Sequence, residues 1–173
     1  MSESVRRYLR YAIMIAERAR EYGSPPFGAI LVSSRGWILS AGENTQGATA
    51  DCTCHAETNL LHEATRRFSR NLLAHSTMYT SAEPCPMCTG AIFWSGVGRI
   101  VFGLSSERLY ALTQDKAEHI FEHCDDLLAR GTHRVEVCGP MLEDEAESVF
   151  RTTTTLTNAP YADGESLLDC EYY

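Results

Sequence analysis

Two short motifs place metal-binding and acid–base side chains at a spacing that suits catalysis. The first is His-Ala-Glu at residues 55–57, and the second is Pro-Cys-Pro-Met-Cys at residues 84–88. His55, Cys85 and Cys88 offer three ligands to one ion, and thiolates with an imidazole favour zinc over magnesium or calcium. Three protein ligands leave the fourth tetrahedral position to water, as in catalytic zinc sites. The motifs therefore predict one zinc ion per subunit, with a bound water or hydroxide.

Glu57 lies two residues after His55, so it is expected to point toward the same cavity without having to touch the metal. Zinc lowers the pKa of its bound water to about 7. A carboxylate beside that water can take its proton and pass it to a substrate nitrogen. Glu57 is therefore the predicted catalytic residue of a hydrolytic enzyme.

Parts of these motifs also occur in other kinds of site. A lone Cys-x-x-Cys pair is common in structural zinc and redox sites, and a lone His-Ala-Glu is often a plain helix start. Cys52 and Cys54 immediately precede His55, so one of them could complete a closed structural site. Such a chain would be a zinc-stabilised interaction module, and Glu57 would have no task. We expect instead that Cys52 and Cys54 are thiols of the core or the pocket wall.

The elements that must position the motifs follow from the apolar pattern along the chain. Helices are expected at residues 4–22, 56–69, 87–94, 115–129 and 141–151, and strands at residues 27–33, 37–42, 77–81, 99–104 and 135–138. Each motif therefore lies where a helix begins. The positive end of a helix favours thiolates over thiols, which suits metal binding by the two cysteines.

This order of elements predicts an α/β fold with three layers, α/β/α, around a five-stranded mixed sheet. The first two strands are joined by a short turn at residues 34–36 and should form an antiparallel hairpin. The later strands are joined through helices and should be parallel. Ligands of such sheets bind beyond the carboxyl ends of the strands, where the motifs lie. We expect one catalytic domain at residues 1–151 and a C-terminal tail at residues 152–173.

Composition narrows the class of partner. The chain has 173 residues and a formal charge of −8, all of it from residues 136–173, which hold nine acidic residues and one arginine. That acidic end repels phosphate backbones and argues against a nucleic-acid partner. Seven cysteines without a signal-peptide pattern disfavour a disulfide framework. No apolar run is long enough to span a membrane. We therefore expect a cytoplasmic protein with neither a membrane nor a nucleic-acid partner.

The motifs and their flanking residues resemble the cytidine-deaminase-like superfamily, whose zinc nucleobase deaminases share an H-x-E…P-C-x-x-C signature. The resemblance runs from about residue 5 to residue 150, within the branch of bacterial guanine deaminases, cytosine deaminases and tRNA adenosine deaminases. Its strongest pieces are residues 26–29, 42–44, 55–57 and 83–94. It implies that His55, Cys85 and Cys88 bind zinc and that Glu57 moves protons.

The resemblance also implies a set of substrate-binding residues. These are Asn44, Phe27, Ala56, Glu83, Trp94, Asp115 and Tyr173. Asn44 would hydrogen-bond the substrate ring, although an asparagine at such a place could also serve only as a turn residue. Phe27 and Trp94 would wall or stack on the base, or else belong to the core. Glu83 would either hold the zinc loop or face the substrate.

Within this branch, residues 90–94 and the tyrosines at the C-terminus look most like the bacterial guanine deaminases. There the C-terminal segment closes over the active site, often from the partner subunit of a domain-swapped dimer. The resemblance therefore implies a homodimer, with Tyr173 in a lid. Asp115 matches one residue of an acidic pair in those enzymes, whereas Lys116 replaces the other.

The first expected substrate is a small-molecule nucleobase or nucleoside, with guanine or a related aminopurine ahead. Cytosine, cytidine and other aminoazines are alternatives, and so is the adenosine of a tRNA. Two local arginine clusters, at residues 6–10 and 66–70, could line a basic groove for tRNA, or they could be the wet faces of helices.

Overall fold

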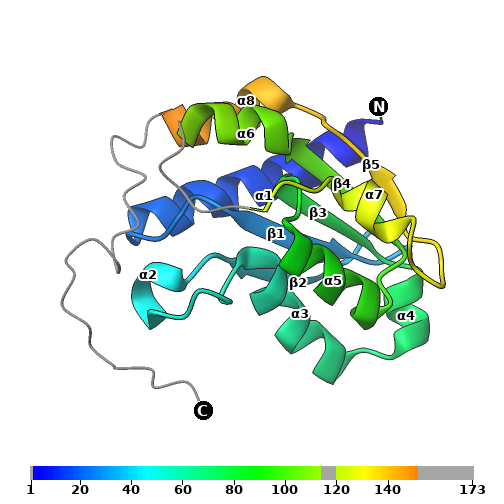
Figure 1. The fold of residues 1–173 in the computed structure, drawn as a ribbon. Helices are drawn as coiled ribbons and strands as arrows, with labels where there is room; N and C mark the ends of the chain where they lie inside the picture. Colours follow the sequence, from blue (N-terminus) through cyan, green and yellow to red (C-terminus); the bar gives the residue numbers. More distant parts are fainter. Residues whose placement is uncertain (1, 114–119, 152–173) are drawn as a thin grey trace, which may run out of the picture.

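A mixed five-stranded sheet in the order β2-β1-β3-β4-β5 forms the middle layer of the protein (Figure 1). The computed structural model describes residues 2–113 and 120–151. Its strands are β1 (Gly28–Val32), β2 (Ile38–Glu43), β3 (Thr77–Ala82), β4 (Arg99–Leu104) and β5 (Glu136–Cys138). β1 is antiparallel to both β2 and β3, and β3, β4 and β5 are parallel to one another. The predicted hairpin and parallel crossovers are therefore confirmed.

Helices cover both faces of the sheet. They are α1 (Glu3–Glu21), α2 (Gln46–Thr49), α3 (Ala56–Arg67), α4 (Arg70–Ala74), α5 (Pro86–Ser95), α6 (Ser106–Thr113), α7 (Cys124–Leu128) and α8 (Glu143–Arg151). Figure 1 shows α1, α6 and α8 over one face, and α3, α4 and α5 over the other. This is the α/β/α arrangement that the order of elements predicts.

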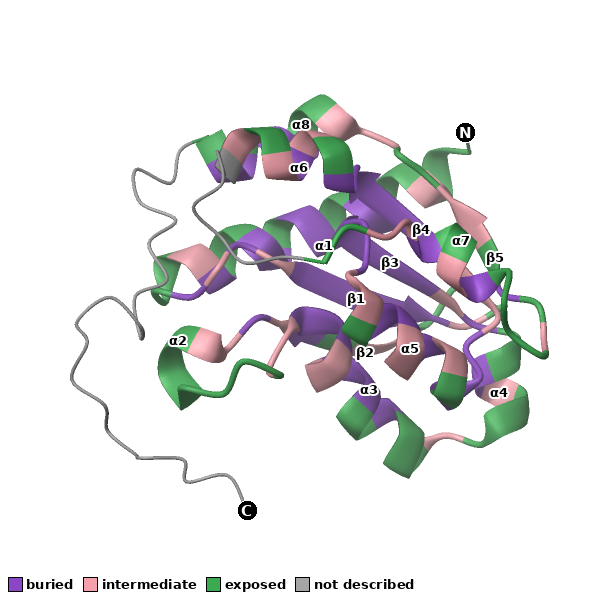
Figure 2. Cartoon of the chain, viewed as in Figure 1, coloured by how far each residue is buried: buried purple, intermediate pink, exposed green. Residues whose placement is uncertain are grey.

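Alternation along β1 explains why both faces are covered. Its five residues are all buried, and Ile30 and Val32 pack into one apolar cluster while Ala29 and Leu31 pack into the other. Side chains of a strand alternate between the faces of a sheet, so a strand that is apolar at every position needs cover on both sides. Figure 2 shows the central strands buried and the outward faces of the helices exposed.

The segment after β4 differs from the expectation. A helix was predicted at residues 115–129, but residues 120–123 are not helical and α7 begins at Cys124. The reason is tertiary: the backbone N–H of Cys124 and the ring of His123 both contact the Glu83 carboxylate. His123 accordingly has extended φ and ψ angles of −65° and 140° and caps the shortened helix. The short helices α2 and α4 and the helix α6 were not predicted.

One edge of the sheet carries the functional segments. The carboxyl ends of β3 and β4 lie there together with the start of β1, because Ala82 pairs with Leu104 and the N–H of Gly28 donates to the Ser81 hydroxyl at 3.1 Å. α5 begins just beyond β3, and the β2 end leads to α3. Parallel strands with crossover helices thus bring both motifs to the expected edge.

Two further expectations concern membrane-spanning helices and the division of the chain at residue 151. Within the described ranges, no helix is both long and apolar enough to cross a bilayer. The division into a catalytic domain at residues 1–151 and a tail at residues 152–173 stays a prediction, because the tail lies outside the described residues.

Gly42 of β2 provides a test of how closely the sheet supports the first turn of α3. A Cβ atom at this position would lie 2.2 Å from the Ala56 carbonyl oxygen and 2.9 Å from the Leu60 Cβ. We expect Gly42→Ala to lower the free energy of unfolding by about 1–3 kcal/mol, because overpacking forces the backbone apart. Urea denaturation measures the change.

Gly90→Ala is the matched control, since a Cβ atom there would meet no atom within 4 Å. Gly90 lies inside α5, so alanine should leave stability unchanged or raise it by up to about 1 kcal/mol. Equal stability of the Gly42→Ala variant and the wild type would contradict the close packing of β2 on α3.

Candidate zinc and catalytic site

Three potential ligand atoms meet between the starts of α3 and α5. The donor atoms of His55, Cys85 and Cys88 all lie within 4.8 Å of one another. The Nδ1 atom of His55 is 3.6 Å from the Cys85 sulfur and 3.5 Å from the Cys88 sulfur. Tetrahedral zinc, with bonds of about 2.3 Å to sulfur and about 2.0 Å to nitrogen, holds these two atom types about 3.5 Å apart. The residues present therefore fit a zinc ion in both chemistry and spacing.

Local helix geometry explains how the sequence delivers these ligands. His55 is the residue before the first turn of α3, with extended φ and ψ angles of −73° and 159°. Cys85 has the same position before α5, and proline follows it at the first helical position. Proline is well suited there because it has no N–H to leave unsatisfied. Both motifs thus present their ligands from helix N-termini, where the helix dipole favours negative charge.

The two thiols differ in their readiness to ionise. A hydrogen bond from Cys88 and the neighbouring His55 lower the pKa of Cys85 to about 4, although burial opposes the shift. The same bond and burial raise the pKa of Cys88. Cys85 is therefore a thiolate at neutral pH, which is the form that binds a metal ion.

Glu57 lies beside this group as a buried carboxyl. Its side chain is 6% exposed, and its Oε2 atom is 3.5 Å from the Cys88 sulfur. Burial, and then the negative charge of Cys85, raise the pKa of Glu57 to about 7. A carboxyl with such a pKa can both accept and donate a proton near neutral pH.

Cys52 and Cys54 do not belong to the three-residue group. Cys52 is exposed, Cys54 is half-buried, and neither sulfur lies among the clustered donor atoms. Within the described ranges, the group therefore consists of three potential protein ligands. This arrangement favours a catalytic site over the closed structural alternative.

Three of the predicted substrate-binding residues lie close to the start of β1. The backbone N–H of Asn44 donates to the Phe27 carbonyl at 3.0 Å, and the Asn44 side chain is buried. The Phe27 ring is half-buried and packs against Phe150, with ring centroids 5.2 Å apart. Ala56 is fully buried in the core cluster beneath β2. Their contact with substrate stays a prediction.

The structure does not bring Trp94 to this group. Trp94 lies in the last turn of α5 and is 77% exposed. It follows Cys88 by six residues, which is about 9 Å along a helix axis. The exposure of Trp94 contradicts its alternative role in the core, and its predicted contact with the base stays a prediction. Asp115 and Tyr173 lie outside the described residues, so their predicted roles stay predictions.

Glu83 is bonded inward rather than presented to a ligand. One carboxylate oxygen accepts from the Ser106 N–H at 3.0 Å, and the other accepts from the Cys124 N–H at 3.0 Å and contacts the His123 Nδ1 at 3.2 Å. Glu83 thus joins the segment before Cys85 to the starts of α6 and α7. Of its two predicted roles, these contacts favour holding the zinc loop.

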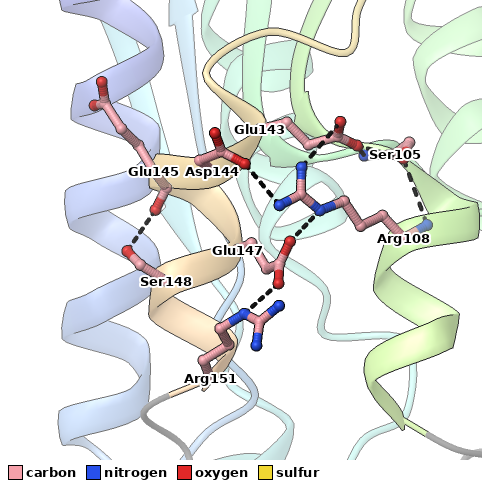
Figure 3. Close-up of polar contacts among 8 residues, drawn as sticks. All are labelled: Ser105, Arg108, Glu143, Asp144, Glu145, Glu147, Ser148 and Arg151. Atoms are coloured by element: carbon pink, nitrogen blue, oxygen red, sulfur yellow. Dashed lines mark hydrogen bonds and ion pairs between the residues drawn. The ribbon is translucent and has the colours of Figure 1, made fainter.

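An ion-pair network then joins α6 to α8 (Figure 3). Arg108 contacts Glu143, Asp144 and the buried Glu147, and Glu143 also accepts from the Ser105 hydroxyl at 2.5 Å. The buried Glu147 carboxylate is paired both with Arg108 of α6 and with Arg151 of its own helix, so the pair with Arg108 joins α6 to α8. The network therefore supports α6, whose first N–H bonds Glu83.

Several residues near the site escaped the sequence analysis. Tyr110 and Phe121 pack edge to face with ring centroids 5.9 Å apart, and burial followed by the charges of Cys85 and Glu83 raises the pKa of Tyr110. Asn59 and Gln46 bind the chain around Asn44. Only Asn59 had a sequence signal, because it lies four residues after His55 and so shares its helix face.

Comparison with known proteins agrees with this geometry. The family model of the cytidine and deoxycytidylate deaminase zinc-binding region matches residues 2–104. A probable cytosine deaminase of Schizosaccharomyces pombe is 44% identical over 149 residues, which cover 84% of this chain and 90% of that protein. A tRNA-specific adenosine deaminase of Haemophilus influenzae is 33% identical over 151 residues, or 87% of this chain and 83% of the other. A solved guanine deaminase from Nitrosomonas europaea has a TM-score of 0.69 at 27% identity, covering 83% and 81% of the two chains.

The fold and the matched zinc-binding region define a zinc-dependent hydrolytic deaminase. The chain belongs to the cytidine and deoxycytidylate deaminase family. The predicted enzyme class, fold and zinc cofactor are therefore confirmed, and His55, Cys85 and Cys88 are positioned to hold the metal.

Zinc stoichiometry tests the three-ligand site. We expect Cys88→Ala to be isolated with substoichiometric zinc, because the metal loses one of its three protein ligands. Mass spectrometry of the metal after dialysis, together with circular dichroism to check folding, provides the measurement. Cys54→Ala is the matched control and should keep one zinc ion per chain. Loss of zinc from that variant would instead support a closed site with Cys54 as the fourth ligand.

Proposed function

We propose that the protein hydrolyses the exocyclic amine of a free nucleobase and releases ammonia, with cytosine and guanine as the first substrates to consider. One observation carries this proposal: a buried carboxyl, Glu57, lies 3.5 Å from one sulfur of the three-residue group that can hold zinc. A closed structural zinc site has no use for a buried carboxyl at that place.

The chemistry needs an activated water and a group that moves protons. When bound, zinc supplies the water and lowers its pKa to about 7. Glu57 takes the proton that the attacking water releases and delivers it to the ring nitrogen beside the attacked carbon. Glu57 then moves the second proton of the water to the amine, which leaves as ammonia while the carbon becomes a carbonyl. The buried Glu57 carboxyl carries the proton in each of these transfers.

Two lines of resemblance support a free base. The Schizosaccharomyces relative carries the name of a cytosine deaminase, and the Nitrosomonas structure that of a guanine deaminase. Residues 90–94 and the tyrosine ending placed guanine first on sequence grounds. The identity of 44% over most of the chain raises cytosine to equal rank.

The relative that acts on tRNA makes RNA the second candidate. The positions of the arginine clusters argue against it. Tyr8, within the first cluster, donates to the Gly36 carbonyl at 2.8 Å, and Gly36 lies in the β1–β2 turn at the sheet edge away from His55. Arg70 donates to the Trp94 carbonyl at 3.3 Å, at the far end of α5 from Cys85. Neither cluster therefore borders the zinc site, which favours a small-molecule substrate.

We also propose that the protein is a homodimer and that the tail containing Tyr173 closes over the site. Both proposals rest on the resemblance to guanine deaminases alone. Sedimentation analysis and removal of residues 152–173 would address them separately.

Glu57→Gln tests the proposed proton carrier. The amide keeps the size of the side chain but cannot accept and return a proton, so we expect kcat to fall by about 10²–10⁴-fold. Zinc content should stay at one ion per chain, which separates loss of chemistry from loss of metal. Wild-type turnover in a variant with full zinc content would show that Glu57 does not carry the proton.

An ammonia-release screen tests the substrate class. The panel contains cytosine, guanine, adenine, their nucleosides, and an adenosine-containing tRNA anticodon stem-loop. We expect release from cytosine or guanine and little from the RNA. Release from the stem-loop alone, with salt-sensitive binding in a gel shift, would replace our proposal with tRNA editing.

A further inference from the structure

We propose that Gln46 is a positioning residue that presets the side-chain amide of Asn44 for substrate, while Asn59 locks this pair to the helix that carries His55 and Glu57. The proposal deepens the proposed nucleobase deamination and rests on it for the role of Asn44 as a contact of the substrate ring.

Both ends of the Asn44 amide are held by one neighbour. Its Oδ1 accepts from the backbone N–H of Gln46 at 2.9 Å, and its Nδ2 donates to the Gln46 Oε1 at 2.8 Å. A backbone N–H can only donate, so the atom that faces it must be the oxygen. The orientation of the amide is therefore determined by chemistry, and Gln46 prevents its rotation.

The fixed orientation leaves a defined hydrogen-bonding pattern. Within the described part of the chain, the side chain of Asn44 makes no further hydrogen bond, so one Oδ1 lone pair and one Nδ2 hydrogen are uncommitted. An acceptor beside a donor complements the N–H and C=O of a ring amide, an edge that free cytosine and guanine both have. Asn44 is only 1% exposed, and buried polar atoms normally have a hydrogen-bond partner. Hydrogen bonds from a bound substrate would satisfy the two uncommitted atoms.

Gln46 also reaches the loop that leads to the first zinc ligand. Its Nε2 donates to the Cys52 carbonyl at 3.1 Å. The same side chain therefore joins Asn44 to the residues just before His55. Gln46 can do this because it begins α2 directly after the end of β2, with Asn44 two residues away.

Asn59 holds the residues on both sides of Asn44, one by its backbone and the other by its side chain. Its Nδ2 donates to the Glu43 carbonyl at 2.8 Å and to the Thr45 hydroxyl at 2.9 Å, and it lies 3.3 Å from the Cys54 carbonyl. The N–H of Thr45 donates to that same carbonyl at 3.0 Å. Asn59 is on α3, one turn after His55, so these bonds set the distance between Asn44 and the zinc group.

Because α2 is not buried, an effect of Gln46 on the position of Asn44 can be distinguished from an effect on the stability of the protein. No residue of α2 is buried, so the side chain of Gln46 contributes no apolar packing to the core. Its loss should change overall stability little, since surface substitutions have small effects. A selective effect on substrate binding would then come from the orientation of Asn44.

The test compares three variants with the base that the wild type deaminates fastest. Gln46→Met keeps the length of the side chain and removes both of its hydrogen bonds. Gln46→Glu keeps an oxygen for the Asn44 Nδ2 and removes the donor to Cys52. Thr49→Ala is the matched control, because it removes two hydrogen bonds of the Thr49 hydroxyl, to the Thr45 carbonyl at 2.9 Å and from the Asp51 N–H at 3.3 Å, and leaves Asn44 untouched.

We expect Gln46→Met to raise KM by about three- to tenfold. This is the effect of losing one hydrogen bond, here the bond between a misoriented Asn44 and the substrate. Zinc content and kcat should change little, and the melting temperature should fall by less than about 3 °C. Gln46→Glu should recover part of the lost KM, and Thr49→Ala should match the wild type. A wild-type KM in Gln46→Met, or an equal loss in all three variants, would overturn the positioning role.

A second measurement does not need turnover. The Nδ2 hydrogen of Asn44 that bonds the Gln46 Oε1, assigned in amide NMR spectra by its loss in Asn44→Asp, should exchange slowly with solvent in the wild type. We expect faster exchange in Gln46→Met and unchanged exchange in Thr49→Ala. Unchanged exchange in Gln46→Met would contradict the proposal that Gln46 fixes the Asn44 amide, even if the enzyme proved inactive on every base. Inactivity of the wild type with a normal exchange pattern would instead count against the proposed function alone.

Discussion

The convergence of one imidazole nitrogen and two sulfurs constrains the rest of this structure. His55 and Cys85 are 30 residues apart in sequence, yet their ligand atoms lie 3.6 Å from each other. This distance requires α3 and α5 to begin at the same sheet edge and to pack on the same face. The α/β/α fold meets that requirement because the helices that follow β2 and β3 cross back over one face of the sheet and pack on one apolar cluster.

Two sets of polar contacts surround the zinc group, and each holds a different segment of the chain. On one side, Glu83 bonds the starts of α6 and α7, and Arg108 ties α6 to the buried Glu147 of α8. These contacts hold the loop before Cys85. On the other side, Asn59 ties the segment around Asn44 to α3. Buried polar groups of this kind are worth most when every member is satisfied, because an unpaired member is costly. The segment before Cys85 and the segment around Asn44 are therefore each held by their own set of buried polar contacts.

Burial of Glu57 links this architecture to chemistry. A carboxyl exposed to water would have an ordinary pKa and would be ionised throughout the reaction. The same carboxyl, buried in the first turn of α3 beside the negative Cys85, has a pKa near 7. The fold that brings the metal ligands together therefore also tunes the group that moves protons.

Much of the fold followed from local pattern. Apolar periodicity located all five strands and the long helices, since each pattern reflects which residues of that segment must face a core. The pattern fails after β4, where it does not predict α6 and predicts a helix across residues 120–123. There the decisive contact is the one between Glu83 and the chain some 40 residues later, and no local pattern encodes it.

The sequence by itself determined the ligand types, the acid–base carboxyl and hence the class of reaction. These depend on residue chemistry and on helix starts, both of which are local properties. Only the tertiary structure decided that Cys52 and Cys54 stay outside the ligand group, that Trp94 lies in solvent at the far end of α5, and that Glu83 bonds inward. Each of these outcomes depends on which elements pack together, because adjacent positions in a sequence can end on opposite sides of a helix or sheet. The residues that orient Asn44 were likewise visible only once β2, α2 and α3 lay side by side.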